Sequence, residues 1–263
     1  MQQQVNAYPV ASLASPEQLA GGVAVVIDVL RASTTIAHAL AAGAAEVIPC
    51  REVEEARRLA SELPSGSVLL GGERRGERIP GFDLGNSPAE YSPARVAGKT
   101  VVFTTTNGTR AVLRCRQARR VLIGAFVNAA AVLRELVDQK RVDLVCAGTG
   151  GQISRDDLLL AGLLSARLAR QPGIDCRLNS EAMMARHAWD AAFSPSDGNR
   201  DEPPAPELLA RELRNSLGGR NLAAIGLEGD IADAAQMDRL GCVPELDVHA
   251  LRIRLPRRSR TPA

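Results

Sequence analysis

The stretch VVFTTTNGTRAVL, residues 101–113, contains the turn that decides the fold. An apolar run ends in three threonines, continues through Asn-Gly-Thr-Arg and enters a segment with helical spacing. This pattern predicts a buried strand, a loop and then a helix. Hydroxyl and amide side chains at such a corner, with Gly108 allowing close backbone approach, suit the binding of an anion.

Short apolar runs alternate with helical patterns on both sides of this stretch. The runs are rich in valine and isoleucine and cover residues 23–27, 47–48, 68–70, 101–103, 121–123 and 144–146. Runs of this kind predict buried parallel strands. The spacing of helices that lie on a sheet occurs in residues 33–42, 53–63 and 129–137. The sequence therefore predicts an α/β fold, with mostly parallel sheets between layers of helices.

The apolar runs and their loops also repeat. VVIDVLRASTTIAHAL, AEVIPCREVEEARRLA and SVLLGGERRG align in order with VVFTTTNGTRAVL, RRVLIGAFVNAAAVLREL and VDLVCAGTGG, at an offset of about 75 residues. We interpret this as an internal duplication of a βαβαβ-type unit, the alternative being that any two α/β segments align this well. The chain then divides into a first repeat with a long charged loop (1–99), a second repeat (100–170) and a helical completion with a tail (171–263), packed as one globular unit.

The last third of the chain has a less regular pattern. SPSDGNRDEPPAPELL, residues 194–209, is rich in proline and acidic residues and predicts a surface loop. Helical segments are expected around residues 208–217 and 231–240, and the tail RRSRTPA is expected to be disordered.

Loops that follow parallel strands are where open α/β sheets bind ligands. In the first of these loops, Asp28 comes directly after an apolar run, and Arg31, Ser33 and Thr34 open the next helix. A carboxylate there can hold a hard cation such as magnesium, while hydroxyls and free amides at a helix start can bind phosphate. The alternative is that Ser33 or Thr34 is an ordinary N-cap and Asp28 an ordinary loop residue.

Two further loops are rich in polar and charged groups. Residues 104–110 supply threonine hydroxyls, the amide of Asn107 and the guanidinium of Arg110. The loop GGERRGERIPGFDLGNSP, residues 71–88, offers carboxylates as metal ligands or acid/base groups, and arginines, an amide and a hydroxyl as anion partners. Some of its charged residues, Arg75, Glu77 and Arg78, could instead be solvated surface groups.

The fourth loop, CAGTGGQISRDDLLLAG, is glycine-rich but lacks the spacing of a dinucleotide site or a P-loop, which counts against a nucleotide cofactor. Ser154 and Asp157 have capping-box spacing, so we assign them to helix capping. Asp156 and Asp157 are kept as metal candidates of second rank.

Composition narrows the class of protein. A net charge of +2 and 3% aromatic residues disfavour nucleic-acid binding. No apolar run approaches the roughly 20 residues of a membrane span. Five cysteines without a CxxC predict reduced thiols, and the cytoplasm is the expected location. His38, His187 and His249 lie in no metal-binding motif, so we expect catalysis not to depend on histidine.

Taken together, VIDVLRAST, GGERRGERIPGFDLGNSP, TTTNGTRA and AGTGGQISRDDLLLAG resemble the 2-phosphosulfolactate phosphatase family of coenzyme M biosynthesis. The similarity extends over residues 25–246 and includes GLEGDIADAAQMDRLGCVPEL. The resemblance implies a Mg²⁺-dependent phosphatase that hydrolyses (2R)-2-phospho-3-sulfolactate to 3-sulfolactate and phosphate. A homodimer is expected for an enzyme of this size.

The resemblance and the residue types together assign the site. Asp28, Glu73 and Asp83 are expected as metal ligands or catalytic acid/base groups. The cradle for the anionic substrate is expected to consist of Arg31, Ser33, Thr34, Arg74, Asn86, Ser87, Thr105, Thr106, Asn107, Gly108, Thr109 and Arg110. Attack by water and a phosphoenzyme at Asp28 are both compatible with these residues.

One position departs from the family pattern. Similar sequences commonly place a histidine before the Gly-Arg pair of SLGGRNL, where this chain has Gly218. The departure leaves room for another phosphorylated 2-hydroxy acid as substrate. A phosphotransferase would need a nucleotide or a second acceptor site, whereas a non-catalytic sensor of such acids could dispense with the carboxylates.

Overall fold

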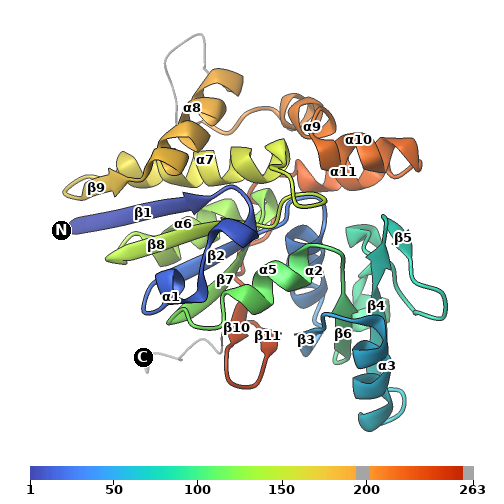
Figure 1. The fold of residues 1–263 in the computed structure, drawn as a ribbon. Helices are drawn as coiled ribbons and strands as arrows, with labels where there is room; N and C mark the ends of the chain where they lie inside the picture. The colour runs from blue at the N-terminus through green and yellow to red at the C-terminus, as the bar shows by residue number, and fades with distance from the viewer. Residues whose placement is uncertain (194–201, 257–263) are drawn as a thin grey trace, which may run out of the picture.

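A mixed sheet of eleven strands runs through the computed structural model, which describes residues 1–193 and 202–256 (Figure 1). The strand order is β5-β4-β6-β3-β11-β10-β7-β2-β8-β1-β9. The strands are β1 (Gln2–Tyr8), β2 (Val23–Ile27), β3 (Glu46–Pro49), β4 (Val68–Arg74), β5 (Glu77–Arg78), β6 (Thr100–Thr104), β7 (Arg120–Gly124), β8 (Arg141–Cys146), β9 (Asp175–Leu178), β10 (Glu245–Asp247) and β11 (Arg252–Arg254).

Helices connect most of these strands. They are α1 (Pro16–Leu19), α2 (Ala32–Ala41), α3 (Val53–Glu62), α4 (Pro93–Val96), α5 (Gly108–Arg114), α6 (Ala129–Leu136), α7 (Arg155–Ala169), α8 (Ser180–Ala192), α9 (Pro206–Arg214), α10 (Leu217–Ala224) and α11 (Glu228–Ala234), with single 3₁₀ turns at Ala11–Leu13, Pro88–Glu90 and Phe126–Asn128. The predicted α/β class is confirmed, since mostly parallel strands alternate with helices.

The six predicted strands are present as β2, β3, β4, β6, β7 and β8, and the three predicted helices as α2, α3 and α6. The predicted segment 208–217 is instead two helices, because Ser216 caps a new one by accepting a hydrogen bond from Gly219 N at 2.9 Å. The segment predicted at 231–240 ends at Ala234, and Asp238 has a φ of 57°, which no right-handed helix allows.

Other predictions for the last third of the chain fall partly or wholly outside the described residues. The predicted surface loop at 194–209 is undescribed up to residue 201, and α9 begins within its last residues, at Pro206. The predicted disordered tail, residues 257–263, lies wholly outside the described residues.

Two groups of parallel strands make up the sheet. One group is β4-β6-β3 and the other is β7-β2-β8-β1-β9. The β10–β11 hairpin lies between them and pairs antiparallel with β7 on one side and β3 on the other. The two parallel groups therefore run in opposite directions.

The two predicted repeats exchange strands. β6, from the second repeat, lies between β3 and β4 of the first, and β2, from the first repeat, lies between β7 and β8 of the second. Among these six strands the order is β4-β6-β3 followed by β7-β2-β8. Exchanging β2 with β6, β3 with β7 and β4 with β8 gives the same order read from the other end. The symmetry supports the internal duplication, which stays a prediction together with the three-part division of the chain.

Apolar side chains of β2 alternate between two buried clusters, one on each face of the sheet. Val23, Val25 and Ile27 belong to the cluster that includes α6, α7 and α8, whereas Ala24 and Val26 belong to the cluster that includes α2 and α5. Figure 1 shows these two sets of helices on opposite sides of β2. Because a strand presents successive side chains to opposite faces, β2 is held by both layers and its end is fixed in position.

Two expectations drawn from composition can be compared with the structure. None of the helices in the described ranges has the length and apolar character needed to cross a bilayer. The five cysteines are free thiols, and burial raises the pKa of both Cys50 and Cys115 to about 12. These thiols are therefore poor nucleophiles at neutral pH.

We expect Ile253→Ala to destabilise the protein by about 2–4 kcal/mol, because Ile253 is fully buried where β11 joins the two parallel groups. Urea denaturation followed by circular dichroism measures the loss. Leu255→Ala is the matched control just beyond the strand: Leu255 is 36% exposed, and its truncation should cost about 0.5 kcal/mol or less. Equal losses for both variants would contradict a structural role for the hairpin.

Candidate active site

A cavity of about 470 Å³ lies where the loops that follow β2, β4, β6 and β8 meet α10. All four loops singled out in the sequence contribute to it. Its lining consists of Asp28, Leu30, Arg31, Glu73, Arg75, Gly76, Asn86, Thr105, Thr106, Asn107, Thr149, Gly150, Gly218, Asn221, Leu222, Ala224 and Ile225.

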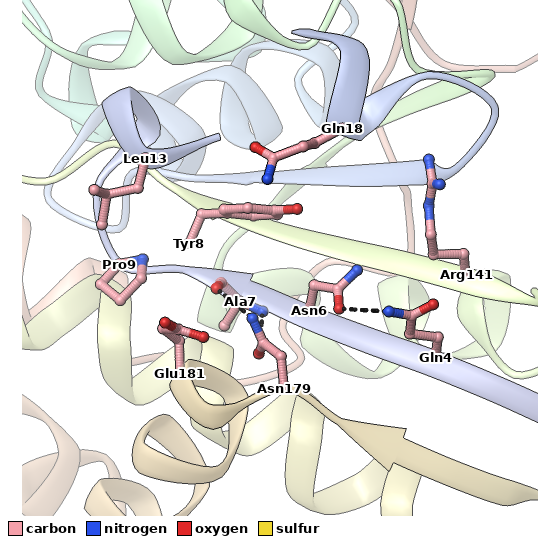
Figure 2. A pocket seen from close by; sticks show the side chains of 10 residues that line it. All are labelled: Gln4, Asn6, Ala7, Tyr8, Pro9, Leu13, Gln18, Arg141, Asn179 and Glu181. Atoms are coloured by element: carbon pink, nitrogen blue, oxygen red, sulfur yellow. Dashed lines mark hydrogen bonds between the residues drawn. The ribbon is translucent and has the colours of Figure 1, made fainter. Parts of the chain in front are cut away.

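A second cavity, of about 520 Å³, lies over β1 (Figure 2). Its lining includes four amide side chains, the ring of Tyr8, the carboxylate of Glu181 and one guanidinium, that of Arg141. That guanidinium is already engaged, since Nε donates to Asp143 Oδ2 at 3.1 Å and Nη2 donates to the carbonyl of Ala20. The second cavity therefore offers no uncompensated cation to a phosphoester, and we place the candidate site in the loop cavity.

Asp28 is a buried carboxylate of the loop cavity and lies directly after β2 with 8% of its surface exposed. Its Oδ1 accepts a hydrogen bond from Ala32 N at 3.2 Å, and its backbone N–H donates to Ser33 Oγ at 3.0 Å. Burial, together with the nearby charges of Asp156 and Glu73, raises the pKa of Asp28 to about 7. Asp28 can therefore exchange a proton near neutral pH, which is a property of catalytic carboxylates.

The predicted capping box at the start of α7 is wrong. Ser154 is the N-cap residue, but its hydroxyl donates to the Asp156 carboxylate instead of capping the helix. Asp157 accepts hydrogen bonds from Val29 N at 2.8 Å and Gly148 N at 2.9 Å. The start of α7 is buried against the β2 loop, so these polar groups bind neighbouring loops and hold the ends of β2 and β8 together.

Asp156 and Asp157, the metal candidates of second rank, are buried at the start of α7 and do not line the cavity. They are 1% and 2% exposed, and burial raises the pKa of each. The charge of Asp28 raises the pKa of Asp157 further. Three carboxylates thus share one buried region beside the cavity.

Glu73 joins two of the loops. Its Oε1 accepts a hydrogen bond from Thr106 N at 2.8 Å, and its Oε2 accepts one from Gly76 N at 2.7 Å. The Thr106 hydroxyl also donates to Oε2 at 3.3 Å. Both carboxylate oxygens are therefore occupied by groups of the protein, which favours a role in positioning the loops.

Arg31 lines the cavity with its charge compensated. Its Nη1 donates to Asp230 Oδ2 at 2.7 Å, and its Nη2 donates to the carbonyl of Gly76 at 2.6 Å. Ser87 donates to the other oxygen of Asp230 at 2.5 Å. Asp230, in α11, was missed in the sequence because nothing local marks an acid of GLEGDIADA as the partner of an arginine 199 residues away.

Several predicted site residues use their polar groups elsewhere. The hydroxyls of Ser33 and Thr34 donate to the carbonyls of Val26 and Val29, at 3.2 and 2.7 Å. The backbone N–H of Thr109 donates to the hydroxyl of Thr105 at 3.2 Å, and the Thr109 hydroxyl donates to the carbonyl of Thr105 at 3.0 Å. These side chains shape the starts of α2 and α5.

Three charged residues expected in the site lie outside the cavity lining. Arg74 donates to Thr104 Oγ1 at 3.0 Å and to the carbonyl of Arg51 at 3.2 Å. Asp83 accepts a hydrogen bond from Leu70 N at 2.8 Å and is exposed. Arg110 is exposed and does not line the cavity.

Three lining residues leave groups or space available to a ligand. Asn86 is 5% exposed, and within the described structure its Oδ1 has no hydrogen-bond partner. Asn107 begins α5 without a capping bond from its side chain. A Cβ at Gly218 would lie 3.4 Å from Asp156 Oδ2, which is ordinary contact, so a methyl group would fit at this position. Thr149 was not assigned to the site from the sequence.

The donor groups suit magnesium better than zinc. In the parts of the chain that the structure describes, no group of three or more His, Cys, Asp or Glu side chains has the arrangement of a metal site. Mg²⁺ binds through one or two carboxylates and completes its coordination with water and substrate phosphate. Asp28 and the Oδ1 of Asn86, which has no partner in the described structure, are oxygen atoms that could serve as such ligands.

Buried carboxylates, guanidinium groups, hydroxyls and amides gathered at the loops of an α/β sheet define an enzyme that acts on a small anionic substrate. Residues 9–249 match the family model described as 2-phosphosulpholactate phosphatase. The chain belongs to this family of phosphoric monoester hydrolases, which confirms the resemblance seen in the sequence motifs.

Relatives with the same name cover most of the chain. A "Probable 2-phosphosulfolactate phosphatase" of Caldanaerobacter subterraneus is 50% identical over 223 residues, which cover 84% of this chain and 86% of the relative. The protein so named in Symbiobacterium thermophilum is 44% identical over 229 residues, covering 87% and 92%. That of Thermotoga maritima is 38% identical over 223 residues, covering 85% and 88%.

We expect Asp28→Asn to stabilise the protein, with a gain that grows from about pH 4 to about pH 7. The folded protein keeps the Asp28 proton up to a pKa of about 7, whereas the unfolded chain loses it near the ordinary value of 3.8. Wild-type stability therefore falls as the pH rises through this window and stays lower above it, while asparagine has no proton to lose. Urea denaturation in the presence of a chelator at pH 4.5, 6 and 7.5 measures the gap.

Asp83→Asn is the matched control, since it makes the same change at an exposed carboxylate outside the cavity. Its stability relative to wild type should change little over this pH range. A gap for Asp28→Asn that does not change with pH would contradict the elevated pKa.

Proposed function

We propose that the protein is a Mg²⁺-dependent phosphatase that hydrolyses the phosphate ester of 2-phospho-3-sulfolactate to 3-sulfolactate and phosphate. The observation that carries this proposal is the position of Asp28, a buried carboxylate with a pKa of about 7 in a cavity shared by four loops. Membership of the 2-phosphosulfolactate phosphatase family supports the choice of substrate.

The cavity contains binding groups for each part of this substrate, which has a phosphate, a carboxylate and a sulfonate on a short carbon chain. The guanidinium groups of Arg31 and Arg75 line it and can pair with the anions. The Asn107 amide can donate hydrogen bonds to phosphoryl oxygens. Binding at these several points orients the ester relative to Asp28.

Magnesium fits the residues at the closed end of the cavity. We propose that Asp28 and Asn86 hold it, because Asp28 has only one carboxylate oxygen hydrogen-bonded to the protein and Asn86 Oδ1 has no partner in the described structure. When bound, the ion would offset the negative charge of the phosphoryl oxygens while the ester bond breaks. Glu73 would act as a positioning residue, since it holds the 105–107 loop beside the cavity.

Asp28 is also the group that handles the proton of the reaction. As a general base it would take a proton from the attacking water as the new phosphorus–oxygen bond forms. The bond from phosphorus to the ester oxygen breaks, and that oxygen leaves as the hydroxyl of 3-sulfolactate after it gains a proton from solvent, while Asp28 releases to solvent the proton that it took. Direct attack by Asp28, followed by hydrolysis of a phosphoenzyme, uses the same carboxylate and gives the same products.

A phosphatase for another phosphorylated 2-hydroxy acid is the second candidate. Gly218 lines the cavity and has no side chain, so the space beside it is left to a substrate. A substrate with a larger substituent at carbon 3 would fit this space. A phosphotransferase or a non-catalytic sensor has no such observation in its favour.

We propose a homodimer in the cytoplasm as the working state of the protein. The support for the cytoplasm is that the five cysteines are free thiols, as in reducing compartments. The support for a dimer is that cyclic dimers are the commonest oligomers.

We expect Asp28→Asn to lower kcat for phosphate release from 2-phospho-3-sulfolactate at least about 100-fold, since a general base or nucleophile is lost. Asp83→Asn, outside the cavity, should keep kcat within about 3-fold of wild type, because exposed substitutions away from a site have small effects. Phosphate release with and without Mg²⁺ is the measurement. Full activity of Asp28→Asn, or turnover by wild type that is indifferent to chelation, would overturn the proposal.

A further inference from the structure

The rim of the cavity includes an unusual turn. Strands β4 and β5 pair through Glu73 with Arg78 and Arg74 with Glu77, which leaves Arg75 and Gly76 as a two-residue turn. Both turn residues are left-handed, with φ angles of 56° and 87°. Turns of this geometry favour asparagine, aspartate or glycine at the first position, and an arginine there is strained. Strain of this kind is often found at functional sites.

The turn is held firmly against the cavity. The Gly76 carbonyl accepts a hydrogen bond from Arg31 Nη2 at 2.6 Å, and Gly76 N donates to Glu73 Oε2 at 2.7 Å. On its other side, a Cβ at Gly76 would lie 2.8 Å from Cδ1 of Ile225, just beyond α10. These contacts fix the backbone on which the Arg75 side chain is carried.

The two guanidinium groups that line the cavity differ in their charge environment. Arg31 is 4% exposed and is paired with Asp230. Arg75 is exposed and lines the cavity, and within the described residues it makes no hydrogen bond or ion pair. Arg75 therefore has its full set of donors available to a ligand, whereas Arg31 has already used two.

Depth within the cavity separates the two ends of a bound substrate. Asp28 is 8% exposed, while Arg75 is on the exposed rim. When the phosphoryl group of the substrate lies at Asp28, the other end of the substrate points toward the rim. A sulfonate at that end keeps its charge at all relevant pH values and matches the planar fork of an arginine.

We propose that Arg75 is a positioning residue that binds the sulfonate of the substrate and makes the enzyme prefer phosphorylated 2-hydroxy acids with a third anionic group. This inference rests on the proposed function, because it takes the reacting phosphoryl group to lie at Asp28. It assigns to Arg75 the role that the sequence gave to its neighbour Arg74.

The test compares two esters, 2-phospho-3-sulfolactate and 2-phospholactate, which lacks the sulfonate. Arg75→Gln should raise KM for the sulfonated ester about 10-fold, as expected for one exposed charge-assisted contact, with kcat unchanged. For 2-phospholactate the same variant should stay within about 2-fold of wild type, because no contact is lost. Arg75→Lys should recover part of the loss, since it restores the charge without the fork.

Two further variants separate binding from folding. Arg78→Gln removes the same charge from the same hairpin at an exposed residue that does not line the cavity, and it should leave KM for both esters unchanged. Arg75→Asn suits the left-handed backbone, so it should be at least as stable as wild type and show the same selective rise in KM. Equal losses on both esters, or the same loss in Arg78→Gln, would overturn the role of Arg75.

Direct binding distinguishes failure of this inference from failure of the proposed function. If wild type hydrolyses neither ester, the proposed function fails. Titration calorimetry with 3-sulfolactate and with lactate then still tests Arg75. An approximately tenfold loss of 3-sulfolactate affinity in Arg75→Gln would support the sulfonate contact, and an unchanged affinity would refute it.

Discussion

The close approach of two helix starts at Gly108 is the constraint on which the candidate site depends. A Cβ at Gly108 would lie 2.5 Å from both Asp28 Oδ2 and the Cβ of Ala32, so only glycine lets α5 begin here without displacing the start of α2. The two parallel groups of the sheet run in opposite directions, and this contact is where the β2 loop of one group meets the β6 loop of the other. Glu73 and Arg31 then connect the β4 hairpin to the same point.

The site concentrates negative charge in a buried region and compensates it only in part. Asp28, Asp156 and Asp157 are each at most 8% exposed, and each has a raised pKa. Hydrogen bonds to Asp157 from the backbone N–H of Val29 and Gly148 stabilise one of these carboxylates, and the pairing of Arg31 with Asp230 closes one wall. Buried charge without a partner lowers stability, which the apolar clusters on both faces of the sheet offset. In the proposed complex, a divalent cation would compensate the negative charge near Asp28, and an arginine at the rim would compensate the charge at the other end of the substrate.

The sequence predicted the strands with continuous apolar runs and the loops that follow them, because burial on both faces leaves a clear pattern. It missed β1, whose sequence begins with three glutamines although β8 and β9 flank it on both sides. It favoured Arg74 over Arg75, since nothing in GGERRGER shows that the strand ends between them. Arg74 pairs within the ladder and bonds to Thr104, whereas Arg75 occupies a left-handed turn that arginine rarely adopts.

The sequence also could not predict hydrogen-bond and ion-pair partners that are far apart along the chain. Ser154 and Asp157 have the spacing of a capping box. Spacing alone cannot show that the β2 loop lies close enough for the backbone N–H of Val29 to donate to the Asp157 carboxylate. Asp230 is invisible for the same reason, because its role is set by Arg31 and Ser87. Local patterns therefore find the loops of a site, while the division of tasks among adjacent polar residues is decided by tertiary contacts.

The predicted duplication allows equivalent loop positions of the two repeats to be compared. In the alignment of the two repeats, Asp28 corresponds to Thr104 and Glu73 corresponds to Gly148. The first repeat thus has carboxylates at the ends of β2 and β4, where the second has a threonine at the end of β6 and a glycine after β8. Because the exchanged strands bring both sets of loops to one cavity, the two halves can differ in charge while they share a backbone. Carboxylates on one side suit a cation and a proton, and hydroxyls and amides on the other suit the oxygens of a phosphate.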